Sequence, residues 1–326
     1  MRLTYRKIEY IREVAQQGSV AAACKTLGVS QSSVFAAITA AEQQAGARLF
    51  SRSKGHGVVP TPAGRKLIVS ARKFLAAGED FERSMAQFSE TSTPVLQIGC
   101  FAPLGAIMIP PVLKRFISQY GECEIVLKEG DQLELRNWLN WGTVDLVVTY
   151  DIGEEYGIGV TPICKCPAHA LLHRDDPDAE NLSISMQQLA RKTHILLDLP
   201  ETRAYILALF DFSGERPKTG LKTRSYETIR SAVANGLGAS ILNMLPCETS
   251  PDTDKVVRIP ISNPLRQPTL VVADPYGDTK PEYVRAFINT VYEYIVGLEP
   301  ENFAVVLPEF SKDLIYAAPD GFSASL

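Results

Sequence analysis

Apolar residues near the N-terminus recur at helical spacing. Four of them lie three and four positions apart and predict an amphipathic helix: Tyr5, Ile8, Ile11 and Ala15. Gly18 ends this helix, and Ser19 is a good N-cap for a short second helix that ends at Gly28. Ser30 caps a third helix in the same way. Two short helices joined in this manner predict a helix-turn-helix, whose second helix enters the major groove of DNA.

The third predicted helix buries one face and leaves its N-terminal residues open. Its apolar face consists of Val34, Ile38, Ala41 and Ala45. The residues of the motif expected to contact DNA are Ser19, Ser30, Gln31, Ser32, Ser33 and Phe35. Gln31 and Ser33 can form hydrogen bonds with base edges, and glutamine pairs well with adenine. For Phe35 two interpretations stand: contact with a thymine methyl group, or packing against the first helix or a second copy of the chain.

Residues 46–61 form two short β-like runs around a glycine-rich, basic tip. This pattern predicts a wing beside the recognition helix. Four long or flexible donors on it suit contacts with DNA phosphates, which fix the register of binding without reading sequence: Arg48, Arg52, Lys54 and His56.

A long helix is predicted after the wing, because Thr61 can cap it and Pro62 suits its first position. From Leu67 onwards, apolar residues and one glycine alternate at spacings of four and three: Leu67, Ala71, Phe74, Gly78, Phe81, Met85 and Phe88. This is a heptad seam, which favours pairing with a helix of a second copy. The alternative is a single amphipathic helix packed on its own domain, which the glycine in the seam favours.

Beyond a polar stretch at residues 89–94, strand and helix patterns alternate, which predicts an α/β body with a largely parallel sheet. Strands are expected at 95–100, 124–128, 144–150, 168–173, 194–198, 221–224, 239–242 and 268–273. Helices are expected at 107–120, 133–141, 185–191, 202–212, 226–235 and 281–296. Two groups of these elements predict two small lobes with a cleft between them.

Charge is distributed unevenly along the chain. Residues 1–73 contain 12 Lys and Arg against three Glu, a net charge of +9, whereas the other 253 residues carry −13. A basic head on an acidic body is typical of a polyanion-binding module joined to a separate domain. No apolar run approaches the ~20 residues of a membrane helix, and the polar start lacks a secretory signal. We therefore expect a cytoplasmic protein with no membrane contact.

Residues 1–65 resemble the LysR-type transcriptional regulators. The resemblance lies in Gly18-Ser19 and Ala21-Ala22, the run from Leu27 to Val34, Ala41-Glu42, Gly46, Arg48-Leu49-Phe50, Arg52 and Thr61-Pro62-Ala63-Gly64. Positions 35 and 36 depart from the family, which usually has a small polar and then a basic residue there. Residues 95–297 are similar, more loosely, to the effector-binding domain of that family, through Leu96 to Gly99, Asp145-Leu146 and Val233 to Gly238.

The resemblance implies four segments. These are a winged helix-turn-helix at 1–61, a dimerisation helix at 62–90, a two-lobed effector domain of the periplasmic-binding-protein type at 91–297, and a tail of unknown role at 298–326. Lobe I covers about 95–166 and 267–297, and lobe II about 167–266. The implied partners are operator DNA, a small-molecule effector, a second copy in a dimer or tetramer, and RNA polymerase. No cofactor or metal is expected.

Ligands of such domains collect at the carboxyl ends of strands and at helix N-termini. The residues selected on this basis are Phe101, Ala102, Pro103, Leu104, Gly105, Tyr150, Asp151, Asp198, Thr202, Arg203, Tyr205, Tyr226, Glu227 and Asn243. Arg203 could clamp a carboxylate beside Tyr150 or Thr202, which indicates a polar metabolite. Asp151, Asp198 and Glu227 could instead hold an amine, so an amino-acid-like effector stays open. Structural alternatives also stand: Thr202 and Asp198 as caps, Arg203 as a solvated helix residue.

An enzyme is disfavoured because the sequence has no glycine-rich phosphate loop, nucleophile elbow or paired His-Glu metal motif. The alternative that we retain is a thiol-redox sensor with the same head. Its candidate thiols are Cys100, at the mouth of the cleft, and the pair Cys164 and Cys166. Scattered cysteines in an intracellular chain are otherwise small core residues.

Overall fold

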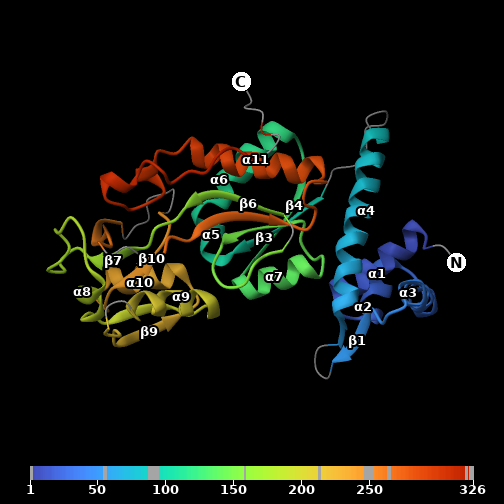
Figure 1. The fold of residues 1–326 in the computed structure, drawn as a ribbon, viewed down its shortest axis with the longest axis horizontal. Coiled ribbons are helices and arrows are strands. Elements are labelled where there is room, and N and C mark those ends of the chain that lie inside the picture. Colours follow the sequence, from blue (N-terminus) through green and yellow to red (C-terminus); the bar gives the residue numbers. More distant parts are fainter. Residues whose placement is uncertain are drawn as a thin grey trace.

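The computed structural model describes residues 3–53, 57–86, 95–157, 159–211, 214–245, 253–262, 266–319 and 322. Figure 1 shows a small helical head, one long helix and a larger body of two lobes. This arrangement confirms the predicted fold class.

The head consists of α1 (Tyr5–Gln17), α2 (Val20–Leu27) and α3 (Gln31–Ala45), followed by the hairpin of β1 (Phe50–Ser53) and β2 (Gly57–Pro60). Gly18 and Gly28 end the first two helices with φ of 60° and 65°, the left-handed conformation expected of them. The backbone N–H of Val58 donates to the Gly18 carbonyl at 2.8 Å, which ties the hairpin to the helix-turn-helix.

Two helix faces in the head differ from prediction. The buried residues of α1 are Tyr10, Ile11, Glu13, Val14 and Ala15, and those of α3 are Val34, Ala37, Ile38, Ala40 and Ala41. Ala45 is exposed, because the last turn of α3 projects beyond the core of the head. Tyr5 is only half-buried, and its hydroxyl donates to the carbonyl of Leu75 in the long helix at 3.4 Å.

The long helix, α4 (Pro62–Ala86), begins where Thr61 and Pro62 predicted. The Thr61 hydroxyl accepts a hydrogen bond from the Gly64 N–H at 3.0 Å and donates to the Arg48 carbonyl at 2.6 Å. The cap therefore also fixes the start of α4 against the wing.

Lobe I is a five-stranded sheet in the order β4-β3-β5-β12-β6. Its strands are β3 (Val95–Phe101), β4 (Glu124–Gly130), β5 (Leu146–Tyr150), β6 (Gly159–Lys165) and β12 (Thr269–Asp274). Its helices are α5 (Ala102–Ile107), α6 (Ile109–Tyr120), α7 (Gln132–Asn140) and α11 (Glu282–Val296). β3 runs parallel to β4 and β5, whereas β12 is antiparallel to β5 and β6, so the prediction of a largely parallel sheet is wrong. The helix expected at 107–120 is α6, and α5 before it, which ends at Ile107, was not predicted.

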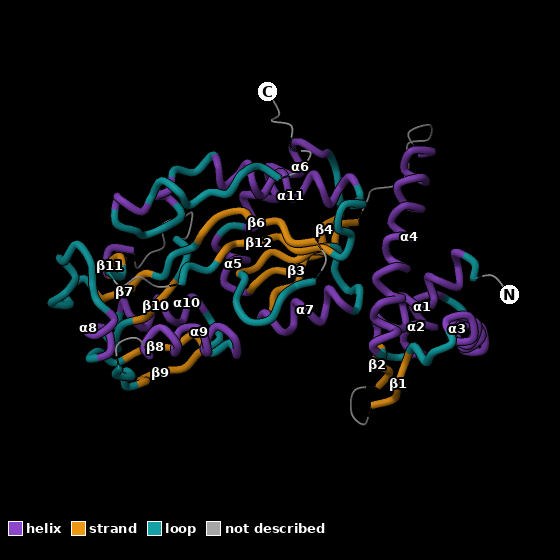
Figure 2. The backbone as a smooth tube through the Cα atoms, in the orientation of Figure 1, coloured by secondary structure: helices purple, strands orange, loops and turns teal. Residues whose placement is uncertain are grey.

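Lobe II contains the antiparallel sheet β10-β7-β11 and the parallel pair β8 and β9. Its strands are β7 (His169–His173), β8 (His194–Leu197), β9 (Thr219–Thr223), β10 (Ser240–Leu242) and β11 (Val256–Pro260). Its helices are α8 (Met186–Ala190), α9 (Pro200–Asp211), α10 (Tyr226–Ala234) and the 3-10 turn η1 (Thr253–Lys255). Figure 2 shows the chain passing between the lobes in two places, after β6 and before β12.

The residues after α11 return along the body through η2 (Pro300–Asn302) and η3 (Pro308–Phe310). Phe303 and Leu314 are buried in the core. The Phe303 carbonyl accepts from the N–H of Leu245, which follows β10 in lobe II, at 3.0 Å. The N–H of Lys165 in lobe I donates to the Leu314 carbonyl at 2.7 Å. The tail therefore crosses from one lobe to the other.

Candidate functional site

The start of α3 presents an open row of polar side chains. The Ser30 hydroxyl accepts from the Ser33 N–H at 3.3 Å and lies 2.8 Å from the Ser32 hydroxyl and 2.9 Å from that of Ser33. Gln31, Ser32 and Ser33 are all exposed, with Ser19 half-buried as the cap of α2. Ser19 and Ser30 therefore cap the helix ends, while Gln31 is exposed to solvent. This geometry suits contact with base edges.

Phe35 lies on the same exposed side, one turn further along α3, and 45% of its surface is accessible. Nearly half of this ring is therefore open to contact with DNA or with a second copy.

The wing residues are only partly described. Arg48 is 85% exposed in its side chain and lies 3.6 Å from the Glu42 carboxylate, an arrangement that leaves its guanidinium open to phosphate. Arg52 lies on β1, and its side chain is outside the described part of the chain. Lys54 and His56 also lie outside the described residues. Their contacts with phosphate stay predictions.

The heptad seam of α4 divides between two environments. Leu67 packs on the core of the head and Ala71 is buried, whereas Phe74 and Phe81 are 52% and 66% exposed. The Phe74 ring lies beside that of Tyr5, with 5.8 Å between centroids. The Met85 side chain and Phe88 lie outside the described residues.

A neighbouring face of α4 is buried against the chain's own head and body: Ile68, Arg72, Leu75 and Ala76. This face of α4 therefore packs within the chain, as the alternative to the dimer seam predicted. The exposed phenylalanines remain available to a second copy.

Both lobes line a small cavity of about 20 Å³, enough for about one water molecule. Its lining from lobe I is Phe101, Pro103, Ile107, Tyr150 and Ile152, and from lobe II Leu197, Thr202, Ile206, Tyr226, Ile241, Leu242, Asn243 and Met244. Six predicted residues are thus brought together: Phe101, Pro103, Tyr150, Thr202, Tyr226 and Asn243. Sequence reasoning missed the aliphatic lining because it searched for polar groups at strand ends.

The predicted charged residues have partners of their own and do not line this cavity. Arg203 donates to the Asp198 carboxylate at 2.5 Å and is 44% exposed in its side chain. Asp151 accepts from the Thr269 N–H at 2.6 Å. Glu227 pairs with Arg230, three residues further along α10.

The other predicted residues have structural contacts. Ala102, Leu104 and Gly105 belong to α5 but do not line the cavity. The Tyr205 hydroxyl accepts a hydrogen bond from the Asn243 side chain at 3.1 Å, which holds Asn243 in place. Thr202 is the third residue of α9 and not its cap.

Direct bonds join the lobes around the cavity. The Gln132 amide and the Thr202 hydroxyl exchange hydrogen bonds at 3.2 and 3.3 Å, and both side chains are buried. The Arg136 guanidinium forms a two-pronged ion pair with Glu201. Arg224 of lobe II lies 3.4 Å from the Asp131 carboxylate. The cleft is therefore closed in this structure.

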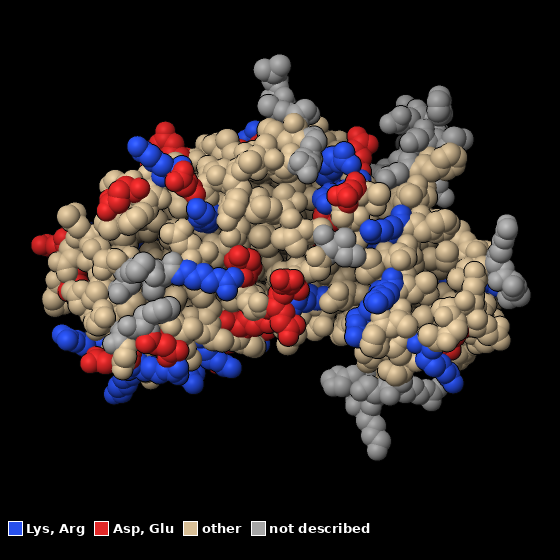
Figure 3. Space-filling view, viewed as in Figure 1, with Lys and Arg blue, Asp and Glu red and all other residues tan. Residues whose placement is uncertain are grey.

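Sequence reasoning missed these closing contacts. The only signal was the sequence Asp131-x-x-Glu134, a capping box that starts α7 at the cleft edge. Figure 3 shows acidic side chains gathered over the junction of the lobes, with basic side chains over the lower edge of lobe II and along the linker helix and head.

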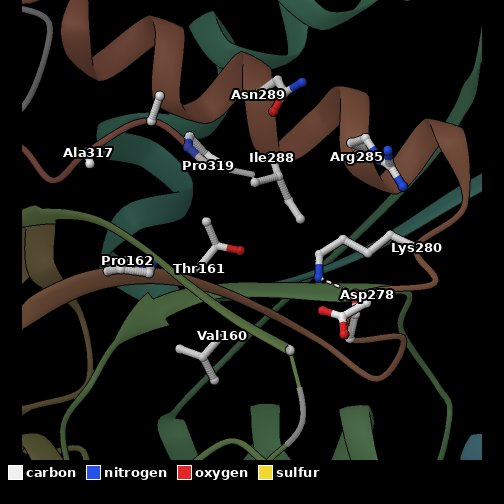
Figure 4. A pocket seen from close by; sticks show the side chains of 13 residues that line it. Val160, Thr161, Pro162, Asp278, Lys280, Arg285, Ile288, Asn289, Ala317 and Pro319 are labelled. Atoms are coloured by element: carbon white, nitrogen blue, oxygen red, sulfur yellow. Dashed lines mark hydrogen bonds between the residues drawn. The ribbon is translucent and has the colours of Figure 1, made fainter. Parts of the chain in front are cut away.

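A larger hollow of about 620 Å³ lies on the outer side of lobe I, away from the cleft. Figure 4 shows Ile288 of α11 pointing towards Thr161 of β6, with Lys280 entering from the side. The Lys280 ammonium lies 2.9 Å from the Asp274 carboxylate and donates to the Gly277 carbonyl at 2.6 Å. Its charge is used within the protein, so the hollow presents no unpaired cation at this position.

The candidate thiols are buried. Burial raises the pKa of Cys100 well above its ordinary value, and the nearby Glu129 acts in the same direction. Burial also raises the pKa of Cys164, whose sulfur lies 3.9 Å from that of Cys166. Thiols with raised pKa values form little thiolate at neutral pH and react slowly with oxidants.

Within the described residues, no group of three or more His, Cys, Asp or Glu side chains is placed to hold a metal ion. Over the same part of the chain, no helix is both long and apolar enough to cross a membrane.

Comparison with known proteins accounts for both parts of the molecule. Residues 5–65 match the bacterial regulatory helix-turn-helix proteins of the lysR family, and residues 89–295 match the LysR substrate binding domain. The regulator YcgK of Bacillus subtilis (strain 168) is 29% identical over 264 residues, covering 75% of this chain and 81% of that protein. The hydrogen peroxide-inducible genes activator of Escherichia coli O6:H1 is 25% identical over 263 residues, covering 80% and 86%.

Among solved structures, the LysR family regulator HinK of Pseudomonas aeruginosa superimposes with a TM-score of 0.57 at 27% identity. The match covers 91% of this chain and all of HinK. The two domain matches together span the head and both lobes, in the order that the sequence predicted. The chain therefore belongs to the LysR-type transcriptional regulators.

Proposed function

We propose that this regulator binds operator DNA as a dimer or tetramer and responds to a small metabolite enclosed between the two lobes. Gln31 to Phe35 read the bases, and Arg48, Arg52, Lys54 and His56 contact phosphate. Phe74 and Phe81, with Leu67, Ala71, Met85 and Phe88 of the same seam, pair two copies. RNA polymerase is the expected further partner on the promoter.

The observation that carries the proposal is the cavity lined by both lobes and closed by cross-lobe bonds. A ligand larger than one water molecule requires the lobes to separate, so binding and lobe position depend on each other. Such a ligand changes the regulator only if it binds one arrangement more tightly than the other.

Two measurements on the full chain test this function. Operator sequences are first selected from a random DNA pool by binding. The thermal unfolding midpoint is then recorded against amino acids, organic acids and aromatic carboxylates, because a ligand of the native state raises it by mass action. The proposal requires that a stabilising compound also changes operator affinity.

A matched pair of variants locates the site. Ile107→Phe fills the cavity, whereas Leu182→Phe adds the same ring at a position that is 88% exposed. The compound's effect should be lost in the first variant and kept in the second. If the compound keeps its effect in both variants, it binds outside this cleft.

A thiol-redox sensor is the second candidate. It is favoured by the similarity to a hydrogen peroxide-inducible activator and by the 3.9 Å between the sulfurs of Cys164 and Cys166. Burial and the raised pKa of Cys164 oppose it. Peroxide that changes operator affinity in the parent chain but not in C164S or C166S would establish the sensor. An equal response in parent and variants would exclude these thiols.

A further inference from the structure

Helix α7 lies between the cleft and the DNA-binding head. It has nine residues, from Gln132 to Asn140, and is therefore about 14 Å long. Figure 1 shows it along the lower side of lobe I, with α9 of lobe II towards one end and the long helix α4 towards the other. α7 contacts both of these helices. One short helix of lobe I thus touches the second lobe and also the helix that carries the head.

The first half of α7 forms bonds that close the cleft. The buried Gln132 side chain exchanges hydrogen bonds with the Thr202 hydroxyl of lobe II. Arg136, one turn further along α7, forms the two-pronged ion pair with Glu201. Separation of the lobes breaks these bonds and leaves this end of α7 held by lobe I alone.

The turn after α7 is packed closely against the linker helix α4. Gly142 has a φ of 72°, and a Cβ atom there would lie 2.6 Å from Cδ of Arg72 and 3.1 Å from Cγ2 of Ile68, both on α4. The Arg72 guanidinium also donates to the carbonyl of Val144, two residues further on. This turn therefore has no room to move towards α4 without displacing it.

Trp141 lies at the same end of α7, opposite the head. It is the C-cap of the helix, is half-buried, and lines a groove of about 470 Å³ together with the end of α1 and the base of the wing. The head residues of this groove are Ala15, Gln16, Gln17, Gly18, Val58, Val59 and Pro60. Two of them, Gly18 and Val58, form the backbone bond that ties the wing to the helix-turn-helix. Trp141 thus lies opposite the segment that positions the wing.

We infer that α7 transmits the position of lobe II to the DNA-binding head. Gln132 and Arg136 form the end that senses the lobe, and residues 141–144 form the end that positions α4 and the wing. Opening of the lobes releases the first half of α7, and a small sliding movement of this helix then shifts the contact with α4. The inference rests on the proposed function, because it names how the lobe movement of that function reaches the DNA.

A charge reversal on lobe II opens the cleft without altering α7. Glu201→Lys places a second cation opposite Arg136. Asp211→Lys is the matched control, because Asp211 ends the same helix, α9, and pairs with Arg216 at an exposed position. Hydrogen exchange at the start of α7 should increase in Glu201→Lys alone. Unchanged exchange in Glu201→Lys would show that lobe II does not hold this end of α7 and would overturn the inference.

The second test uses the two tryptophans of the chain, Trp138 in the last turn of α7 and Trp141 at its C-cap. Trp138→Phe leaves Trp141 as the only tryptophan reporter. Adding Glu201→Lys should increase the quenching of Trp141 fluorescence by acrylamide, because the released helix packs less closely beside the head. Adding Asp211→Lys should not. Equal quenching with and without Glu201→Lys would overturn the inference.

Operator affinity tests whether the movement reaches the DNA contacts. On operator DNA selected from a random pool, the affinities of Glu201→Lys and Asp211→Lys should differ by about fivefold or more. In a Trp141→Ala background they should differ by less than about twofold, because the side chain opposite the wing is removed. An equal effect of Glu201→Lys with and without Trp141 would overturn the inference. The quenching experiment needs no substitution at position 141 and decides the question if Trp141→Ala does not fold.

Two outcomes separate this inference from the proposed function. If the chain selects no operator, the proposed function fails and the inference fails with it. If a compound changes operator affinity equally in the parent chain and in Trp141→Ala, the proposed function stands and transmission through α7 fails.

Discussion

Arg72 in the linker helix α4 and Asp145, directly before β5, form an ion pair with 2.7 Å between Nη2 and Oδ1, and each residue is less than 8% exposed. The Arg72 guanidinium also donates to the Val144 carbonyl. Asp145 accepts from the Gln97 N–H at 2.8 Å and from the Tyr276 hydroxyl at 3.2 Å. These bonds tie the helix that carries the DNA-binding head to the central strands of lobe I.

Removing one partner of this pair should destabilise the protein strongly. Arg72→Ala leaves the Asp145 charge buried without its counter-charge, and we expect a loss of about 3–5 kcal/mol in the free energy of unfolding. Urea unfolding of the full chain measures it. The control Arg216→Ala breaks an exposed pair and should cost no more than about 1 kcal/mol. Similar small losses in both variants would contradict the structural role of Arg72.

Acid should destabilise the body through two buried histidines. Burial lowers the pKa of His169 to about 3, with help from Arg258, and that of His194 to about 4. Both groups bind protons more readily in the unfolded chain, whose histidine pKa is about 6.5. Stability is therefore complete above about pH 6.5 and falls as pH decreases towards 4, by about 2 kcal/mol per histidine at pH 5.

Urea unfolding at pH 7.5 and pH 5 tests this dependence. His169→Gln and His194→Gln should each flatten it, whereas His173→Gln, at a partly exposed side chain, should not. If the free energy of unfolding changes between pH 7.5 and pH 5 in both variants as it does in the parent chain, the two histidines are not the cause of the acid destabilisation.

The two kinds of DNA contact should separate in their salt dependence. Gln31→Ala should cost about 1–3 kcal/mol on the selected operator and relax preference at one base pair. Arg48→Ala should weaken all sequences alike and reduce the slope of log K against log salt by about one. Gln43→Ala, exposed at the far end of α3, is the control. A loss of sequence preference in Arg48→Ala would reverse the two assignments.

The exposed phenylalanines of α4 should determine assembly. Phe81→Glu places a charge in the predicted seam and should shift the chain towards monomer in sedimentation. Ala204→Glu adds the same charge at an exposed position of α9 and should not. If both variants remain dimers, another surface pairs the copies.

The cross-lobe ion pair should restrain opening. Glu201→Gln weakens the grip of Arg136 and should increase hydrogen exchange at the start of α7 and α9, where Gln132 meets Thr202. Glu215→Gln, also on lobe II but away from the cleft, is the control. Unchanged hydrogen exchange in Glu201→Gln would show that other contacts keep the lobes together.

Local signals in the sequence predicted local structure well. Thr61 and Ser30 cap helices as their positions indicated, because capping depends on a few adjacent residues. Strands β6 and β11 were missed, since each contains a proline, Pro162 or Pro260, which reads as a break. Both strands lie at sheet edges, where proline is tolerated.

The candidate site was harder to predict because its partners come from distant parts of the chain. Arg203 looked like a clamp, yet Asp198, five residues away, neutralises it. The seam of α4 indicated one apolar face, but Arg72 on a neighbouring face is buried by the body, more than 70 residues later in sequence. Such pairings depend on tertiary packing, which cannot be deduced from the hydrophobic periodicity of the sequence.

The tail beyond α11 also links the two lobes. One anchor is Phe303, bonded to Leu245 of lobe II, and the other is Leu314, bonded to β6 of lobe I. Separation of the lobes must therefore break one of these backbone bonds or extend the tail next to its anchors. Opening of the cleft thus depends on a segment that contributes no residue to the lining of that cleft.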